Sequence, residues 1–456
     1  MKAKKPLKFL DRKFLSILDD WIKRDDRLPL IVKGARQVGK TACIRKFAEG
    51  RFASVVEINF ALRPEFKVIT QDGYGVASII RNISLVDPRC KFIEGDTLIF
   101  FDEIQDFPEI ATSFKSFAED GRYDVVSSGS LLGIQFKRIE SISVGYQETQ
   151  TMRSMDFEEF LWARGYRPEQ LDDLYARLVE RCPFGAAAIE SFDRLFLDYC
   201  VLGGMPEVEA SYFDKGTFEG VPAIQRRIVS DYRADVRRYA EGLDPQRIVS
   251  VFDSIPAQLA KENKKFQLSK IEHGARRKDY WGCVEWLQDA GIVTLCKAVD
   301  FPELPLAAHA DSSRFKLYMS DSGLLVARLD EESQEDVRVR RNLGTWKGGL
   351  FENIVSEALV KAGAEPAYFK KENATLEMDF LLRSRDDLVP VEVKAENARS
   401  KSLRTLIDSD HYKDIRWGVK LIHGDVGFER SVLTIPQWSA FWLPRLLKDP
   451  ALAIPL

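Results

Sequence analysis

A glycine-rich turn between an apolar strand and a helix constrains this sequence more than any other feature. Residues 34–41 read GARQVGKT and match the pattern GxxxxGK[ST], known as Walker A. The turn follows the apolar run 28–32 and precedes the helical run 42–48. In that context the glycines allow backbone N–H groups to wrap phosphates at a helix N-terminus. The alternative is a chance glycine turn, which the full motif in this context makes the weaker interpretation.

The same turn contains the residue types that bind a nucleoside triphosphate and its metal ion. Lys40 can place its ammonium on the β- and γ-phosphates, and the Thr41 hydroxyl can be a ligand of Mg²⁺. The sequence therefore predicts a phosphate cradle. Its residues are Gly34, Ala35, Arg36, Gln37, Val38, Gly39, Lys40, Thr41 and Ala42.

A second apolar strand ends in two adjacent acids, the pattern known as Walker B. Residues 97–103 read TLIFFDE. Asp102 is predicted to bind the Mg²⁺ hydration shell, and Glu103 to orient or deprotonate the attacking water as a catalytic residue. Gln105 could also face the phosphate. By itself such a strand end is as often a solvated end as a metal-binding one, but here it follows a predicted phosphate-binding turn.

The next strand, 124–128, ends in the hydroxyl-rich segment SSGS at 127–130. We predict that Ser128 reaches the γ-phosphate or the water as a further catalytic residue. A plain helix N-cap by Ser130 explains the sequence nearly as well.

Composition limits the remaining function classes. The 456 residues, 45% hydrophobic and 30% charged, suit a soluble globular protein, with a prior of about three domains. The net charge of −3 provides no global field for nucleic acid, so such binding requires a local patch. No apolar run approaches the ~18 residues of a spanning helix. The six scattered cysteines predict free thiols, and we expect a cytoplasmic protein with no membrane association.

Four segments differ in their patterns. Residues 1–160 alternate strands and helices, which predicts a parallel sheet. Residues 161–260 have helical periodicity. Residues 261–330 suggest a small helical module with a β-wing, strands 292–299 and 314–319, and a linker or solvated helix follows at 330–341. Residues 345–456 start with a helix at 348–360 and continue with strands around 376–382 and 389–394.

A carboxylate–lysine pattern lies in the C-terminal segment. Asp379 lies on one strand, and Glu392 and Lys394 lie on one face of the next. With Glu352 from the preceding helix, the carboxylates are predicted to hold a divalent metal, and Lys394 to polarise its water for attack on a phosphodiester. The pattern resembles PD-(D/E)XK nucleases. The alternative is a fold kept for docking, with the acids in structural ion pairs.

The densest basic region lies between Lys261 and Lys278, with seven basic residues against two glutamates. In helix-turn-helix folds the start of the recognition helix approaches DNA. We predict DNA contacts from Lys264, Lys265, Lys270, Arg276, Arg277 and Lys278. A solvated face or a protein-docking module is the alternative. The neighbouring aromatic residues Tyr280, Trp281 and Trp286 have core-like spacing and are interpreted as packing.

Taken together, GARQVGKT, IFFDEIQ, SSGSLLGI, MDFEEFLWA, YCVLGGMPE and LAKENKKF resemble a prokaryotic family of AAA+-type ATPases with a C-terminal domain of unknown function. The resemblance covers nearly the whole chain. It implies a multidomain α/β protein: an AAA+ core that uses ATP and Mg²⁺, a helical and winged-helix middle, and a C-terminal restriction-endonuclease-like domain.

The resemblance also implies a homo-oligomer, a ring or open helix, because AAA+ sites form between neighbouring subunits. Such proteins usually carry a basic residue where this chain has Tyr146, after the segment Ser143–Gly145. The transition-state arginine from a neighbour is therefore unassigned, with Arg138 and Arg153 as candidates.

Three functions fit these patterns. The first is an ATP-hydrolysing protein that binds DNA, including branched or forked DNA, and cleaves it through the C-terminal domain. The second is a nucleotide-gated regulatory or defence-type ATPase whose C-terminal domain binds DNA or a protein without cleavage. The third is an assembly ATPase with a protein partner. We expect the first.

Overall fold

The computed structural model describes residues 8–130, 144–240, 242–261, 264–272, 274–344, 346–372, 374–394 and 400–454. The chain divides into two compact units. The first comprises Met1–Ser154, Tyr232–Pro245 and Glu285–Gly291. The second comprises Met155–Asp231, Gln246–Val284 and Ile292–Leu456. In the described residues no helix is both long and apolar enough to cross a membrane, and all six cysteines are free thiols, as predicted.

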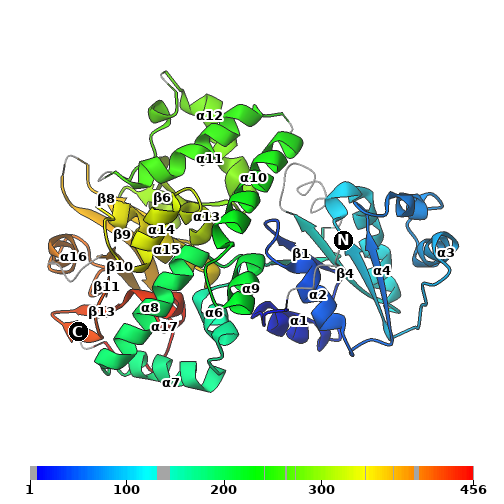
Figure 1. The fold of residues 1–456 in the computed structure, drawn as a ribbon, viewed down its shortest axis with the longest axis horizontal. Coiled ribbons are helices and arrows are strands. Elements are labelled where there is room, and N and C mark those ends of the chain that lie inside the picture. The colour runs from blue at the N-terminus through cyan, green and yellow to red at the C-terminus, as the bar shows by residue number, and fades with distance from the viewer. Residues whose placement is uncertain are drawn as a thin grey trace. The chain divides into compact units, whose positions relative to one another are not determined.

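The first unit is built on a five-stranded parallel sheet in the order β2-β3-β4-β1-β5 (Figure 1). This confirms the predicted parallel sheet. Its strands are β1 (Leu30–Gly34), β2 (Ser54–Asn59), β3 (Thr97–Asp102), β4 (Asp124–Ser130) and β5 (Glu148–Thr151). Its helices include α1 (Phe14–Ile22), α2 (Lys40–Ala48), η1 (Pro64–Thr70), α3 (Val76–Val86), η2 (Ile104–Asp106), η3 (Pro108–Ser113) and α4 (Phe114–Asp120).

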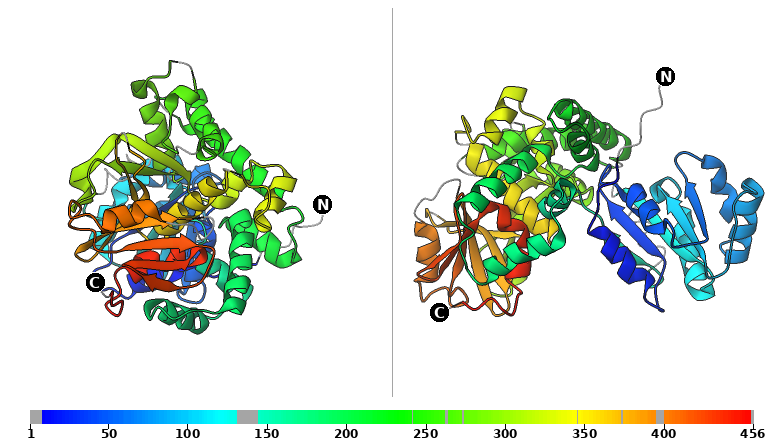
Figure 2. Two further views of the ribbon diagram at one scale, coloured as in Figure 1. Left: turned by 90° about the vertical axis from the view of Figure 1, so that its left-hand side faces the viewer. Right: turned by 60° about the horizontal axis from the view of Figure 1, so that its bottom comes forward.

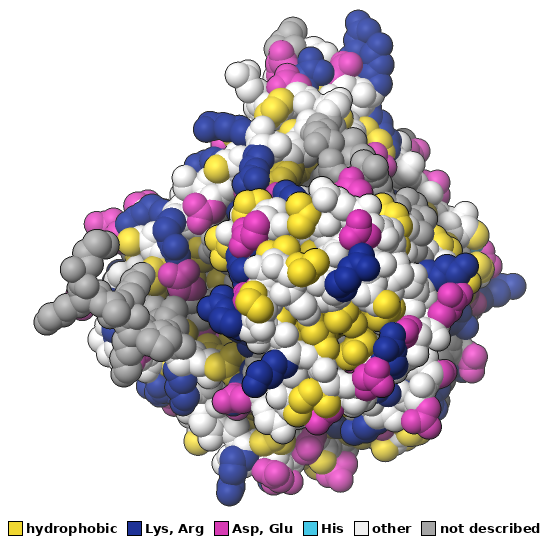
Figure 3. Space-filling view, turned by 90° about the vertical axis from the view of Figure 1, so that its right-hand side faces the viewer, with side chains coloured by type: hydrophobic (Ala, Val, Ile, Leu, Met, Phe, Trp, Pro, Cys, Tyr) yellow, Lys and Arg dark blue, Asp and Glu magenta, His cyan; other side chains and the backbone are white. Residues whose placement is uncertain are grey.

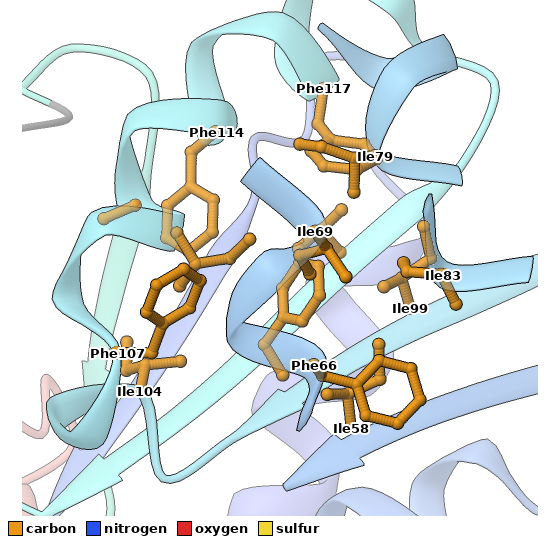
Figure 4. Close-up of a cluster of buried hydrophobic side chains, with 14 of the residues drawn as sticks. Ile58, Phe66, Ile69, Ile79, Ile83, Ile99, Ile104, Phe107, Phe114 and Phe117 are labelled. Atoms are coloured by element: carbon orange, nitrogen blue, oxygen red, sulfur yellow. The ribbon is translucent and has the colours of Figure 1, made fainter. Parts of the chain in front are cut away.

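A cluster of isoleucine and phenylalanine side chains fills the space between this sheet and its helices (Figure 4). Alternation along β3 sends Ile99 and Phe101 into the cluster, where Ile58 of β2 joins them. Phe66, Ile79 and Phe114 cover them from the helices. Each fully buried side chain of this kind contributes about 1.5–3 kcal/mol. The cluster therefore fixes the strand that ends in Asp102.

The second unit begins with a run of helices, which confirms the helical periodicity. They are α6 (Phe157–Arg164), α7 (Pro168–Val179), α8 (Ala186–Leu202), α9 (Pro206–Lys215), α10 (Val221–Tyr239) and α11 (Pro245–Leu259). The final residues of α10 belong to the first unit. The sequence MDFEEF explains the start of α6, because Asp156 accepts from the Glu159 amide and Glu159 accepts from the Asp156 amide, both at 2.9 Å.

The turn between α8 and α9 requires glycine. A Cβ atom on Gly204 would lie 1.8 Å from the Met155 carbonyl oxygen, closer than atoms can approach. The same carbonyl accepts a hydrogen bond from the Tyr199 hydroxyl at 2.9 Å. The close approach of two backbone segments therefore explains the sequence GGMP at 203–206.

An eight-stranded mixed sheet, in the order β12-β13-β11-β10-β9-β8-β6-β7, forms the rest of the second unit. Figure 2 shows its C-terminal strands in orange and red. The strands are β6 (Val293–Val299), β7 (Ala310–Met319), β8 (Ala367–Lys370), β9 (Glu377–Ser384), β10 (Asp387–Val393), β11 (Gly418–Ile422), β12 (Gly427–Glu429) and β13 (Val432–Pro436). The predicted wing strands, β6 and β7, thus share one sheet with the strands of the C-terminal segment.

Helices and 3₁₀ turns connect these strands. They are η4 (Leu268–Lys270), α12 (Arg277–Asp289), η5 (Leu306–His309), α13 (Ser322–Val326), α14 (Glu331–Arg338), α15 (Trp346–Lys361), α16 (Lys401–Ile407), η6 (Gln437–Trp442) and α17 (Leu443–Leu446). The segment predicted as a linker or solvated helix forms α14. In α15 every residue from Gly349 to Leu359 is buried, so this helix lies inside the unit and its polar side chains need partners there.

Candidate active site

The glycine-rich turn lies between the end of β1 at Gly34 and the start of α2 at Lys40. Gly39 has φ 93°, a conformation that favours glycine, and Gln37 adopts φ 65°. A Cβ atom on Gly34 would lie 2.2 Å from the Met152 carbonyl oxygen. The buried Lys40 ammonium donates to the carbonyl oxygens of Gly34 and Ala35, both at 2.9 Å.

Asp102 lies opposite this turn, at the end of β3. The Thr41 hydroxyl donates to its carboxylate, with Oγ1 at 3.2 Å from each oxygen. The Ser128 hydroxyl, from the adjacent strand β4, donates to the same carboxylate. The Asn59 amide at the end of β2 donates to it at 2.8 Å. The structure therefore brings the predicted residues Thr41, Asp102 and Ser128 together, and adds Asn59, which no motif indicated.

Glu103 directly follows β3 in the left-handed conformation, with φ 57°. Its carboxylate accepts a hydrogen bond from the Gln105 side-chain amide. The Gln105 side-chain oxygen, Oε1, in turn accepts a hydrogen bond from the Ser130 backbone amide at 3.2 Å. Gln105 thus holds Glu103 and the end of β4 together. A helix cap by Ser130 would involve residues after 130, which lie outside the described residues.

Burial changes the proton affinity of both charged groups in this site. It lowers the pKa of Lys40 to about 8, although Glu103 and Asp102 act in the opposite direction. Burial also raises the pKa of Asp102, opposed by the hydrogen bond from Ser128. Both effects mark a desolvated site, and strongly perturbed pKa values of this kind are typical of functional sites.

The C-terminal end of α10 contacts the glycine-rich turn within the first unit. The Tyr232 hydroxyl donates to the Arg36 carbonyl oxygen at 2.9 Å. The Arg36 guanidinium lies 3.2 Å from the buried Asp235 carboxylate and 5.9 Å from the centre of the Tyr239 ring. These residues were not expected at the site, because they lie far from the motif in sequence.

A separate cluster of charged side chains surrounds Glu352 of α15 in the second unit. Its carboxylate accepts from the ammonium of Lys264 and, at 3.0 Å, from the Tyr318 hydroxyl. The Lys316 ammonium lies 3.4 Å from Glu352 Oε2, 3.1 Å from Glu377 Oε1 and 4.0 Å from Asp379 Oδ1. Two lysines therefore neutralise Glu352, one of the predicted metal-ligating acids.

The remaining residues of the predicted metal site have other partners. The Glu392 carboxylate lies 2.7 Å from the ammonium of Lys394. Asp379 Oδ2 accepts from the Val393 backbone amide at 2.8 Å. Across the described ranges there is no group of three or more His, Cys, Asp and Glu side chains that could hold a metal ion. The arrangement therefore does not fit the divalent ion that the PD-(D/E)XK resemblance implies.

The two acids of this cluster differ in proton affinity. Burial and the neighbouring Glu352 carboxylate raise the pKa of Asp379 to about 8. Burial acts in the same direction on Glu352, but the ammonium groups of Lys316 and Lys264 outweigh it and lower the pKa of Glu352. Glu352 is thus the ionised partner of the lysines.

The predicted DNA-contact residues differ in exposure. Lys270, Arg276 and Lys278 are exposed, and Lys265 is half-buried. Arg277 stacks on Trp281, 4.2 Å from the ring centre, and donates to the Ser312 carbonyl oxygen. Lys264 is paired with Glu352. Trp281 itself packs against Phe315 at 5.4 Å, and Tyr280 and Trp286 are buried, in agreement with a packing role.

Three protein families match consecutive parts of the chain. Residues 26–161 match the family described as AAA domain, residues 193–335 a domain of unknown function (DUF8612), and residues 347–438 another (DUF4143). The first unit is an AAA+-type P-loop ATPase core. This match implies that the protein uses ATP. No curated protein matches the sequence.

Several solved structures resemble the chain at low identity. A Walker-type ATPase of Pyrococcus abyssi has 14% identity and a TM-score of 0.43, with 70% of this chain and 96% of that chain covered. The Orc1 protein of Aeropyrum pernix, solved in complex with DNA, has 13% identity and a TM-score of 0.30, with coverages of 74% and 94%. RuvB of Thermotoga maritima has 12% identity and a TM-score of 0.27, with 72% of this chain and 93% of that chain covered.

The oxygen ligands of the ATPase core fit the Mg²⁺ that accompanies ATP. The Thr41 hydroxyl and the Asp102 carboxylate are hard oxygen donors, the type that Mg²⁺ prefers, and they already lie within 3.2 Å of each other. Of the candidate arginines, Arg153 is exposed and Arg138 lies outside the described residues. Tyr146 packs under the Lys115 ammonium, 5.0 Å from its ring centre.

Proposed function

We propose that this protein is a nucleotide-gated ATPase that binds DNA through the module around α12 and does not cleave it. The observation that carries the ATPase part is the meeting of Thr41, Asp102 and Ser128 at the carboxyl ends of β3 and β4, beside the buried Lys40. We leave strand cleavage out of the proposal, because Lys264 and Lys316 neutralise the acids that a metal would need.

In the proposed reaction each residue of the nucleotide site has a defined task. Lys40 releases the carbonyl oxygens of Gly34 and Ala35 and donates to the β- and γ-phosphates. Glu103, held by Gln105, accepts a proton from the attacking water. Thr41 and Asp102 would hold the Mg²⁺, which, when bound, neutralises phosphate charge.

The proposed DNA contact rests on three exposed cations at the start of α12 and in η4: Lys270, Arg276 and Lys278. Because the start of α12 is fixed by Arg277 on Trp281 and Ser312, Arg276 and Lys278 extend from a rigid element. Lys264 is left out of this set since it pairs with Glu352. The winged-helix character of this module is part of the proposal.

We further propose that the protein assembles into a homo-oligomer through its ATPase core. Exposed hydrophobic side chains of this unit include Leu62 at 81% exposure and Leu85 at 76%. Figure 3 shows hydrophobic side chains gathered on one face among basic and acidic ones. A surface of this composition suits a protein interface better than a nucleic-acid interface.

The decisive experiment measures ATP turnover with and without duplex and forked DNA. Lys40→Ala removes the ammonium and should abolish turnover, whereas Lys46→Ala, an exposed lysine of the same helix, should leave it unchanged. DNA should raise the turnover of the unaltered protein. Turnover that Lys40→Ala leaves intact would refute the assigned site, and turnover indifferent to any DNA would favour a protein partner.

A second arm isolates the DNA surface. Charge reversal of Arg276 and Lys278 to glutamate should weaken DNA binding and flatten its salt dependence, because each lost phosphate contact reduces counterion release. Reversal of Lys401 and Lys413, two exposed lysines of the same unit, is the charge-matched control. Equal binding by both double variants would remove α12 from the interface.

A further inference from the structure

The lysine–carboxylate cluster of the second unit comprises Glu352, Glu377, Asp379, Lys264 and Lys316. At its centre the Lys316 side chain is 1% exposed, and its ammonium lies within 4.0 Å of all three carboxylates. Carboxylate oxygens are the ligands that divalent ions prefer, but here they surround a cation that belongs to the chain itself.

The negative charge of the cluster is compensated without a further ion. Lys264 pairs with Glu352, and the ammonium of Lys370 lies 2.8 Å from Glu377. With Lys316, three ammonium groups therefore face the carboxyl groups of Glu352, Glu377 and Asp379, and no negative charge is left uncompensated. A buried group of carboxylates attracts a metal when its negative charge is uncompensated, and this group has lost that attraction.

The position of Lys316 is fixed by the fold. Alternation along β7 places Lys316 and Tyr318 on one face, and both side chains contact Glu352. The Asn353 side chain of α15 accepts a hydrogen bond from the Met319 backbone N–H at 2.7 Å and donates one to the Met319 carbonyl oxygen at 3.1 Å, at the end of the same strand. Lys316 also lies over the Tyr368 ring at 4.9 Å. The ammonium therefore cannot leave without disturbing the packing of β7.

We propose that Lys316 takes the place of the divalent ion, so that this nuclease-like site stabilises the fold through ion pairs and without a metal. We call this ion-pair cluster the lock. The lock fastens the hairpin β6–β7 to α15 and β9. The same hairpin supports α12, because Ser312 of β7 accepts from Arg277. The lock thus helps to hold the module around α12 in place. That this module binds DNA rests on the function proposed above, whereas the lock itself does not depend on that function.

Mn²⁺ binding to the nucleotide-free full-length protein tests the lock. In calorimetry and thermal unfolding, the unaltered protein and Asp379→Asn should respond to Mn²⁺ identically, because any ion at the Thr41–Asp102 site is common to both. An additional Mn²⁺ site that Asp379→Asn removes, or DNA nicking that it abolishes, would overturn the proposal.

A gain-of-site variant gives the second readout. Lys316→Met keeps the length of the side chain but removes its charge, so the variant should unfold at a lower temperature in EDTA and regain several degrees with Mn²⁺. The double variant Lys316→Met/Asp379→Asn should show no such recovery. A folded Lys316→Met protein indifferent to Mn²⁺ would overturn the proposal. If Lys316→Met does not fold, the Mn²⁺ responses of the unaltered protein and Asp379→Asn still test the proposal. ATP turnover, measured separately, tests the ATPase assignment alone.

Discussion

The Thr41 hydroxyl lies 3.2 Å from both carboxylate oxygens of Asp102, although the two residues come from different elements of the ATPase core. This relationship joins the start of α2 to the end of β3. Since Ser128 and Asn59 donate to the same carboxylate, its orientation is fixed by three neighbours. A carboxylate held in one orientation lowers the cost of organising the site during the proposed reaction.

Asp102→Asn should therefore lower the rate of ATP hydrolysis by a larger factor than it lowers the affinity for the nucleotide. The amide keeps the size of the side chain but cannot supply a negative oxygen to Mg²⁺, whose charge stabilisation amounts to several kcal/mol, or about 100-fold in rate. Steady-state ATP turnover and nucleotide titration measure the two effects. Asp72→Asn, an exposed aspartate of the same unit, is the control. Equal turnover by both variants would contradict the role of Asp102.

Asp235→Asn should destabilise the glycine-rich turn from the side of α10. The buried Asp235 carboxylate pairs with Arg36 at 3.2 Å, and loss of its charge leaves that guanidinium without this partner. We expect a loss of about 1–3 kcal/mol in unfolding free energy together with a few-fold lower affinity for ATP. Urea unfolding and nucleotide titration check both effects. Asp214→Asn, an exposed residue, should change neither.

The contrast between Asp102 and Asp235 shows what the sequence could predict. Asp102 ends an apolar strand that local periodicity reveals, and the fully buried β3 agrees with it. The contact of Tyr232 with Arg36 joins residues 196 positions apart, and nothing local marks either residue. Long-range partners of a motif depend on the packing of whole elements, which no short pattern encodes.

Lys316 escaped prediction for a related reason. Its neighbours along the strand are Phe315, Leu317 and Tyr318. A lysine in such a strand is normally expected to face solvent. Its partners lie on α15, 36 residues away, and on β9. Of the C-terminal segment, the helix α15 and the strands β9 and β10 were predicted from the sequence. The ion pairs that replace a metal site depend on how β7 joins the same sheet.

ATP affinity should fall as the pH rises through about 8. Burial lowers the pKa of Lys40 to about 8 in the nucleotide-free protein, so its ammonium is charged below that pH and increasingly neutral above it. Only the charged form attracts the phosphates, so binding above pH 8 must take up a proton. Titrations between pH 7 and about 10 should show a steep loss that Lys40→Met removes. A flat profile in the unaltered protein would contradict this.

Gly204→Ala should destabilise the second unit strongly, in contrast to Gly75→Ala. The new methyl group would lie 1.8 Å from the Met155 carbonyl oxygen, and the Met155 amide also donates to the Gly204 carbonyl at 2.7 Å, so neither segment can withdraw without breaking a hydrogen bond. A loss of about 3 kcal/mol is expected from such overpacking. Gly75 has no atom within 4 Å of an added Cβ and should tolerate alanine. Thermal unfolding of both variants tests the prediction, and equal midpoints would show that the two backbones are not in close contact.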